Sequence, residues 1–210
     1  MLLSANYKLP KKLLVHGYLN IGGEKISKSL GNTINPIELA EKYSADSVRY
    51  SLLKSSVFED SDYSEQILIE RHNNELANKL GNLISRVSTL AEKNTITKTP
   101  NKLLKKLKLK QIENHFDNYE LDKALEKIFA FIDNCNTYIQ TKKPWETKDK
   151  KVLYELADSI KAIAILLNPF IPETSEKIAK QFNFKIDYKN ISTPLKPTKI
   201  KKSDILFKKI

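Results

Sequence analysis

The chain has 210 residues, of which 40% are hydrophobic and 29% are charged, and its formal net charge is +11. This composition excludes an intrinsically disordered chain, and the single cysteine excludes a disulfide framework or a four-thiolate zinc site within it. The positive charge favours a polyanionic partner, above all nucleic acid, although the lysine-rich composition of a biased genome explains part of it.

The start of the chain has no long apolar run, and no stretch approaches the roughly 20 apolar residues of a membrane span. One cysteine also fits a reducing compartment. We therefore expect a cytoplasmic protein without a signal peptide or membrane contact.

The first sixty residues predict mixed structure. Residues 13–21 form a short apolar run that ends in two glycines, which indicates a strand followed by a turn. Asn35 suits the N-cap of a helix and Pro36 its first position. A second short helix is expected over 45–54, before an acidic loop at 58–62. We place a domain boundary near 58–63.

Beyond this loop the pattern becomes helical, and Ser64 is a candidate N-cap. Apolar residues recur at spacings of three and four in three stripes, which predicts amphipathic helices. The stripes are Leu76, Leu80, Leu83, Val87 and Leu90; Leu121, Leu125, Ile128, Ile132, Cys135 and Ile139; and Leu153, Leu156, Ile160, Ile163 and Leu167.

A weaker, very basic helix is expected over 101–116, and a last short one over 173–182. Each stripe is short and ends at proline or asparagine, which argues against a coiled coil. We therefore predict a mainly α fold: a short α/β segment over 1–60, a four- to five-helix bundle over 61–184 and an irregular tail over 185–210.

The loop over 22–32 places two lysines and two serines between glycines. Lys25 and Lys28 are three residues apart, and Ser27 and Ser29 interleave with them. Ammonium and hydroxyl groups suit a phosphate chain whose negative charge grows in a transition state, and glycines permit a close approach. An ordinary exposed basic loop is the alternative that these residues leave open.

The letters KISKSLGN in this loop resemble the KMSKS signature of class I aminoacyl-tRNA synthetases, with Ile26 in place of the usual methionine. The resemblance implies that Lys28 and Lys25 are catalytic and that they bind the phosphates of Mg-ATP together with Ser27 and Ser29. ERHNNELANKLGNLISR, KKPWE, ILLNPFIPETSEKI and DILFKKI also resemble the methionyl-tRNA synthetases, so the resemblance covers nearly the full chain.

Three residues are candidates for RNA recognition. Asn82 and Arg86 are four residues apart on a helix face that points away from the apolar stripe, and their side chains can read base edges. Trp145, the only tryptophan, follows Pro144 in a polar break and can stack on an unpaired base. From the residues alone, a core position for Trp145 is the alternative.

The resemblance to the methionyl-tRNA synthetases implies that Asn82, Arg86, Pro144 and Trp145 recognise the CAU anticodon of tRNA(Met). The nearby lysines would then bind phosphates rather than read bases. They are Lys79, Lys142 and Lys143.

His16 and His115 lack partner ligands nearby in the sequence, and we expect no metal bound by this chain. His16 and His115 are expected in core or surface positions, and His72 on a helix surface. Cys135 lies on an apolar stripe and is expected to be buried.

A complete enzyme of this family needs a nucleotide-binding domain with a HIGH motif and a methionine pocket, and neither is recognisable in these 210 residues. The resemblance therefore implies the C-terminal part of a methionine–tRNA ligase, which works with an N-terminal catalytic domain or subunit and is inactive alone. The alternatives are a stand-alone tRNA-binding module without catalysis, or a fragment of another class I synthetase such as a leucyl-type enzyme.

Overall fold

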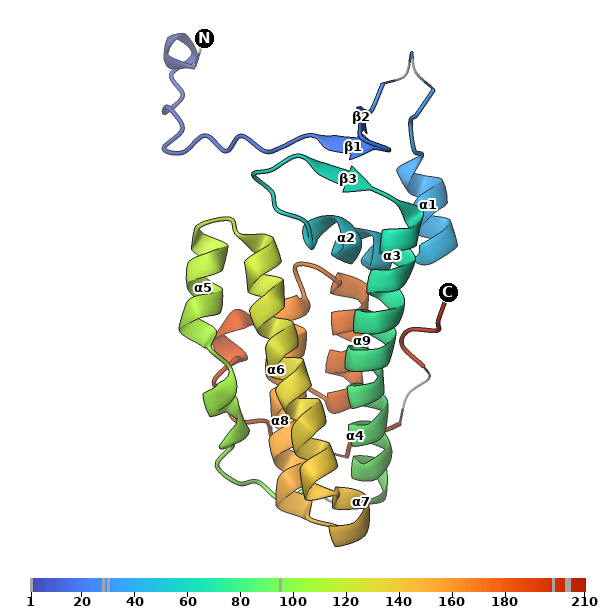
Figure 1. Ribbon diagram of the computed structural model, residues 1–210. Coiled ribbons are helices and arrows are strands. Elements are labelled where there is room, and N and C mark those ends of the chain that lie inside the picture. Colours follow the sequence, from blue (N-terminus) through green and yellow to red (C-terminus); the bar gives the residue numbers. More distant parts are fainter. Residues whose placement is uncertain (1, 28, 30, 95, 198, 203–204) are drawn as a thin grey trace.

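The computed structural model describes residues 2–27, 29, 31–94, 96–197, 199–202 and 205–210. Two parts lie end to end: a small sheet with two short helices, and a long helical bundle beneath them (Figure 1). The predicted mainly α fold with a short α/β segment is therefore confirmed.

A three-stranded sheet forms from β1 (Leu19–Ile21), β2 (Glu24–Lys25) and β3 (Ser61–Tyr63). β1 lies in the centre, where it pairs antiparallel with β2 and parallel with β3. Gly22 and Gly23 form the turn between β1 and β2, and both have the positive φ that a two-residue hairpin turn of this kind requires.

The apolar run over 13–21 forms a strand only over its last three residues, so the prediction of a strand along the whole run is wrong. Most residues before β1 are exposed. The chain first meets the segment that leads into β3 at Gly17, whose amide donates to the Val57 carbonyl at 2.9 Å. A Cβ on Gly17 would lie 2.2 Å from the Glu59 carbonyl oxygen. Glycine therefore permits the close approach of the two segments.

The two short helices α1 (Pro36–Tyr43) and α2 (Ala45–Leu53) lie close to their predicted positions. Asn35 caps α1 as expected, because its Oδ1 accepts from the Ile37 amide at 3.0 Å. β3 follows α2 and pairs with β1, so the α/β part includes residues up to Tyr63.

One continuous helix then joins the two parts of the molecule. It consists of α3 (Glu65–Arg71), η3 (His72–Gly81) and α4 (Asn82–Lys93), and Ser64 caps it by accepting from the Ile67 amide at 3.1 Å. The middle segment, η3, is a π-helix, a wider and rarer form than the α-helix. Nothing in the apolar spacing predicts this widening.

The rest of the bundle consists of helices joined by short connections. The basic helix expected over 101–116 forms in two pieces, because the backbone at Lys108 leaves the helical region. Figure 1 shows α7 at the end of the bundle farthest from the sheet. The remaining elements are η1 (Leu3–Ala5), η4 (Leu103–Lys106), α5 (Leu109–Asp117), α6 (Leu121–Lys142), α7 (Pro144–Thr147), α8 (Lys150–Leu167), α9 (Pro172–Phe182) and η5 (Tyr188–Asn190).

The core of the bundle surrounds α8. Every residue from Val152 to Leu167 is buried, including three charged residues. Lys161 pairs with Asp158 at 3.0 Å, and Glu155 accepts from the Lys102 amide at 3.0 Å, so these buried charges have partners. The two other apolar stripes face the same core, and Leu90 and Leu121 lie at its margin.

Cys135 lies in this core, as expected, and its thiol is buried. Burial raises the pKa of Cys135 to about 12. Among the described residues, no helix is both long enough and apolar enough to cross a membrane.

Polar contacts dock the small α/β part onto the bundle. Asp46 on α2 accepts from the Thr174 amide at 2.7 Å, at the start of α9. Arg49 donates to the Pro169 carbonyl at 2.7 Å. Tyr50, fully buried, donates to Glu75 at 2.6 Å. α2 therefore acts as the joint between the two parts.

His72 is buried, so its expected position on a helix surface is wrong. The side chain is 5% exposed and its Nδ1 lies 2.8 Å from the Ser47 hydroxyl. Its Nε2 lies 2.8 Å from the Lys208 carbonyl oxygen, in the last residues of the chain. The contact partners are 25 and 136 residues away in the sequence, which a local pattern does not reveal.

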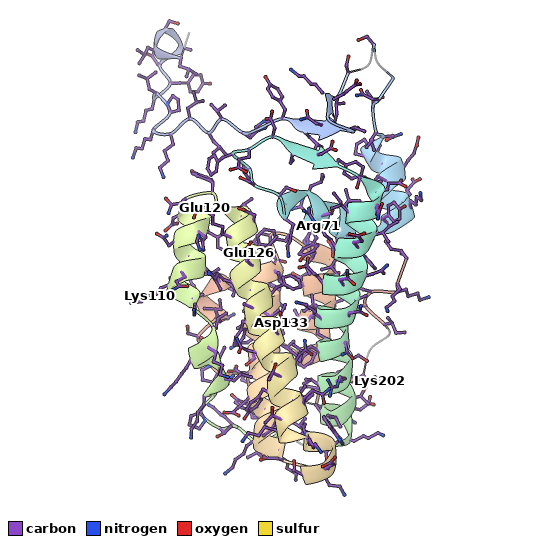
Figure 2. All side chains as sticks on the ribbon, in the orientation of Figure 1. Arg71, Lys110, Glu120, Glu126, Asp133 and Lys202 are labelled. Carbon is purple, nitrogen blue, oxygen red and sulfur yellow. The ribbon has the colours of Figure 1, made fainter. Side chains whose placement is uncertain are left out.

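The tail beyond α9 is irregular apart from η5, and it packs along the bundle. Phe207 is buried and meets the His72 ring edge-on, with the ring centroids 5.7 Å apart. The Lys202 amide donates to Glu92 at 3.1 Å, and Figure 2 shows Lys202 beside α4. Asn73 exchanges hydrogen bonds with Ile210 at 2.7 and 3.1 Å.

Candidate nucleic-acid interface

An exposed indole and a guanidinium meet at the far end of the bundle. Trp145 lies on the short helix α7 and is 40% exposed. The guanidinium carbon of Arg86, on α4, lies 5.3 Å from the centroid of the Trp145 ring, which is cation–π contact distance. The contact leaves part of the indole free to stack on another planar group.

The backbone around α7 explains why this indole is exposed. Lys143 and Lys148 flank the helix in the left-handed region, with φ of 44° and 52°. These two residues reverse the chain sharply between α6 and α8. Pro144 is buried at the first helical position, where its fixed φ suits a helix start. Pro144 therefore holds the turn in place, and Trp145 projects from it.

Asn82 is exposed at the first position of α4, one turn before Arg86. The two side chains therefore share one helix face, as the four-residue spacing predicts. Asn82 and Trp145 are exposed, whereas Arg86 between them is half-buried against the indole. Within the described residues, no hydrogen bond from the Asn82 side chain is recorded, so its amide is available to a base edge.

The three lysines expected to bind phosphates differ in their surroundings. Lys79 pairs with Asp133 at 2.8 Å, and Figure 2 shows Asp133 midway along α6. Lys143 pairs with Glu146 at 3.4 Å. Lys142 has no ion pair among the described residues, and its ammonium lies 5.9 Å from the Tyr138 ring centroid. Lys142 is thus the most available of the three to an anion.

The glycine-flanked loop at the opposite end presents hydroxyl and ammonium groups to solvent. The ammonium of Lys25 lies 4.0 Å from the Tyr18 ring centroid, a cation–π contact. The hydroxyls of Ser27 and Ser29 lie 2.7 Å apart. Lys28, the central lysine of the predicted site, lies outside the described residues.

Asn32 closes this loop and is a residue that the spacing of lysines and serines does not single out. Its side-chain Oδ1 accepts from the Ser27 amide at 2.8 Å, and its Nδ2 donates to the Lys25 carbonyl at 3.2 Å. Gly31 next to it has a φ of +67°. The combination of glycine and asparagine at the end of the motif is the signal in the sequence for this closure.

The donors of the loop fit phosphate groups. An ammonium and two hydroxyls can donate to phosphate oxygens, and the exposed position leaves room for a ligand. Among the described residues, no group of three or more histidine, cysteine, aspartate or glutamate side chains is placed to hold a metal ion. The loop therefore suits an anion, whereas the Trp145 surface suits an unpaired base.

Comparison with known proteins relates both ends of the chain to one enzyme family. A family model described as "tRNA synthetases class I (M)" matches residues 1–88, and one described as "Anticodon-binding domain of tRNA ligase" matches residues 101–208. The first model ends within α4, so Asn82 and Arg86 lie in the first and Trp145 in the second.

Similar curated proteins include the methionine–tRNA ligase of Rickettsia prowazekii, which is 37% identical over 86% of this chain and 40% of its own length. The methionine–tRNA ligase of Caldanaerobacter subterraneus is 35% identical over 100% of this chain and 37% of its own length. The chain thus spans about 40% of the length of these relatives.

Solved structures show the same likeness. The methionyl-tRNA synthetase of Mycobacterium tuberculosis in complex with methionyl-adenylate has a TM-score of 0.88 and 28% identity, over 98% of this chain and 46% of that chain. The free-state structure of the same enzyme has a TM-score of 0.86 and 26% identity. The similarity therefore extends through the sheet, α2 and the bundle.

Proposed function

Because the chain belongs to the methionyl-tRNA synthetases of class I and carries their anticodon-binding domain, we propose that it is the tRNA-selecting part of a methionine–tRNA ligase. In this proposal it corresponds to the C-terminal portion of the enzyme and binds the CAU anticodon of tRNA(Met). It works with an N-terminal catalytic domain or subunit that holds the methionine.

The contact of Arg86 with the exposed ring of Trp145 is the single observation that supports this function most strongly. A buried tryptophan would have no access to RNA, and an isolated one would lack a neighbour that can hydrogen-bond to the same nucleotide. Here the indole offers a stacking surface, and Arg86 and Asn82 offer donors to base edges. Stacking supplies affinity, and hydrogen bonding supplies the choice of base.

The glycine-flanked loop would serve the activation of the amino acid. Lys25, Ser27, Lys28 and Ser29 would hold the phosphates of ATP, and ATP when bound supplies the adenylyl group to methionine. The ammonium of Lys25 and the two hydroxyls would offset the charge that develops on the departing pyrophosphate. Asn32 would keep the loop backbone in the shape that presents these groups.

The anticodon assignment is tested by the binding of two RNA stem-loops that differ only in the anticodon, CAU and CAA. We expect the chain to prefer CAU, measured by fluorescence anisotropy of labelled RNA at fixed salt. Arg86→Ala and Asn82→Ala should each reduce this preference by about 1–3 kcal/mol, the cost of losing a base contact. Ser85→Ala, an exposed change on the same helix, is the matched control.

Equal binding of the two stem-loops by the unaltered chain would contradict the assignment, and a preference for CAA would favour a leucyl-type enzyme. The role in catalysis is tested separately, by mixing the chain with a matching N-terminal catalytic half and measuring aminoacylation. Activity that is restored by the chain but lost with Lys28→Ala supports the assembled ligase. Unchanged CAU binding without restored activity supports a tRNA-binding module alone.

A further inference from the structure

A basic groove lies on the side of the bundle where η4 meets the adjoining ends of α6 and α8. Its volume is about 500 Å³. Four lysines line it. Lys102 precedes η4 and Lys106 ends it, Lys142 is the last residue of α6, and Lys151 lies in the first turn of α8. Three separate parts of the fold therefore bring lysines to one groove.

These four lysines are exposed, and no ion pair is recorded for any of them among the described residues. Other lysines of the bundle, such as Lys79, Lys123 and Lys161, do have carboxylate partners. Unpaired like charges that share a groove repel one another, and a bound anion relieves this repulsion. The groove is thus prepared for negative charge.

The two acidic residues of the groove are already engaged in holding the lysines in place. Glu155 is buried, and it accepts from the Lys102 amide at 3.0 Å and from the Tyr138 hydroxyl. Asp149 accepts from the Lys151 amide at 2.8 Å and so caps α8. Burial and the contact with Glu155 raise the pKa of Tyr138, which keeps its hydroxyl a donor to this carboxylate.

The groove adjoins the connection that carries Trp145. Lys142 is the last residue of α6, and Asp149 is the N-cap of α8, so the two ends of the α7 connection both border the groove. Arg86 approaches the same connection from α4, and η4 packs against α6 and α8. A nucleic-acid strand that places one base on Trp145 can therefore continue over the end of the bundle into the groove.

We propose that this groove binds backbone phosphates of the nucleotides that flank the anticodon, in the same RNA loop that Trp145 contacts. This inference rests on the proposed function, and it adds a site that acts on RNA without regard to sequence. Phosphate contacts fix the position of an RNA strand, and base contacts select it. The lysines of the groove would position the loop so that Asn82, Arg86 and Trp145 meet the correct bases.

The test compares two double variants of the full 210-residue chain. Lys102→Ala with Lys106→Ala removes two charges from the groove, and Lys105→Ala with Lys108→Ala removes two exposed charges that do not line it. Affinity for the CAU and CAA stem-loops is measured between about 50 and 200 mM salt. Thermal unfolding of both variants establishes that they fold alike.

We expect the groove variant to lose roughly tenfold in affinity, for both stem-loops alike, and the slope of log affinity against log salt to fall by about 1 to 2. The control variant should change the slope by less than half as much. Equal effects of the two variants would overturn the inference, because the charge would then act from anywhere on the surface.

The position of the contact is tested with CAU stem-loops that carry one charge-neutral methylphosphonate next to the anticodon, on either side. A neutral link at the contacted phosphate should weaken binding to the unaltered chain but not weaken it further in the groove variant. If the loss caused by the neutral link and the loss caused by the lysine substitutions add at every position, the groove contacts no flanking phosphate. If the groove variant loses affinity as expected but the unaltered chain does not prefer CAU, the proposed function fails while phosphate binding in the groove stands.

Discussion

Trp145 is held in position by its neighbours and still exposes part of its ring to solvent. Its neighbour Pro144 is buried, whereas its own ring is 40% exposed and rests against the Arg86 guanidinium. The indole is only partly covered in the free protein, and the turn that carries it and the cation–π contact both help to set its position. A stacked base would cover the remaining exposed surface of the ring.

Trp145→Ala should weaken binding of the CAU stem-loop by about 1–3 kcal/mol, the usual contribution of a base stacked on an aromatic side chain. This corresponds to a loss of roughly 5- to 150-fold in affinity. Trp145→Phe should retain part of the affinity, because a smaller aromatic ring can still stack. Anisotropy titrations at one salt concentration measure both.

Because Trp145 is the only tryptophan, its fluorescence also reports the contact directly. Addition of the CAU stem-loop should quench it. Tight RNA binding without any change in this fluorescence would place the bases elsewhere.

At the scale of elements, α2 holds the small part and the bundle together. Asp46 accepts from the amides of Thr174 and Glu173 at 2.7 and 3.4 Å, so a carboxylate of one part caps a helix of the other. A negative charge at a helix N-terminus is favourable both as a hydrogen-bond acceptor and through the helix dipole. This contact links the orientation of the glycine-flanked loop to that of the bundle.

Asp46→Ala should lower the free energy of unfolding by about 1–2 kcal/mol, because the first amides of α9 lose their acceptor at a buried position. Urea titrations followed by circular dichroism give this value. Glu176→Ala, an exposed change on α9, is the control and should stay within about 0.5 kcal/mol of the unaltered chain. A similar stability of the two variants would show that the cap contributes nothing to docking.

The π-helical segment η3 packs against the C-terminal tail at Gly81, a contact that the apolar spacing of the helix does not predict. A Cβ on Gly81, the last residue of η3, would lie 3.2 Å from the Leu76 carbonyl oxygen and 3.6 Å from the Phe207 ring. The tail therefore packs where the helix is widened and where its side chain is smallest. This explains why a glycine stands inside a long helix despite its helix-breaking tendency.

At the scale of the whole molecule, the tail connects the joint to the bundle. Phe207 is 7% exposed, and it lies against His72, which in turn contacts Ser47 on α2. A segment without regular structure thus bridges both parts. The position of the β1–β2 hairpin relative to α7, at opposite ends in Figure 1, depends on this packing as well as on the continuous helix.

Phe207→Ala should lower the free energy of unfolding by about 3 kcal/mol, as expected for an aromatic side chain removed from a packed site. Ile205→Ala, two residues earlier and 70% exposed, should change it by less than about 0.5 kcal/mol. Urea titrations of both variants provide the comparison. Equal stabilities would mean that the tail is not part of the folded unit.

The local features of this protein were determined by the sequence itself. The caps Asn35 and Ser64, the apolar stripes of α6 and α8, and the helix face shared by Asn82 and Arg86 all follow from spacings of a few residues. Such spacings predict structure because helix geometry repeats every 3.6 residues and a cap needs only its next turn. The motif KISKSLGN could likewise be recognised from the sequence, because its residues are adjacent in the chain.

The tertiary structure alone decided which faces meet. It placed α8 at the centre, so that even its charged residues are buried, and it buried His72 between Ser47 and Lys208. It also set Arg86 against Trp145 and gathered four lysines from three elements into one groove. These contacts join residues far apart in the sequence, and they depend on the packing of the whole chain rather than on any local repeat.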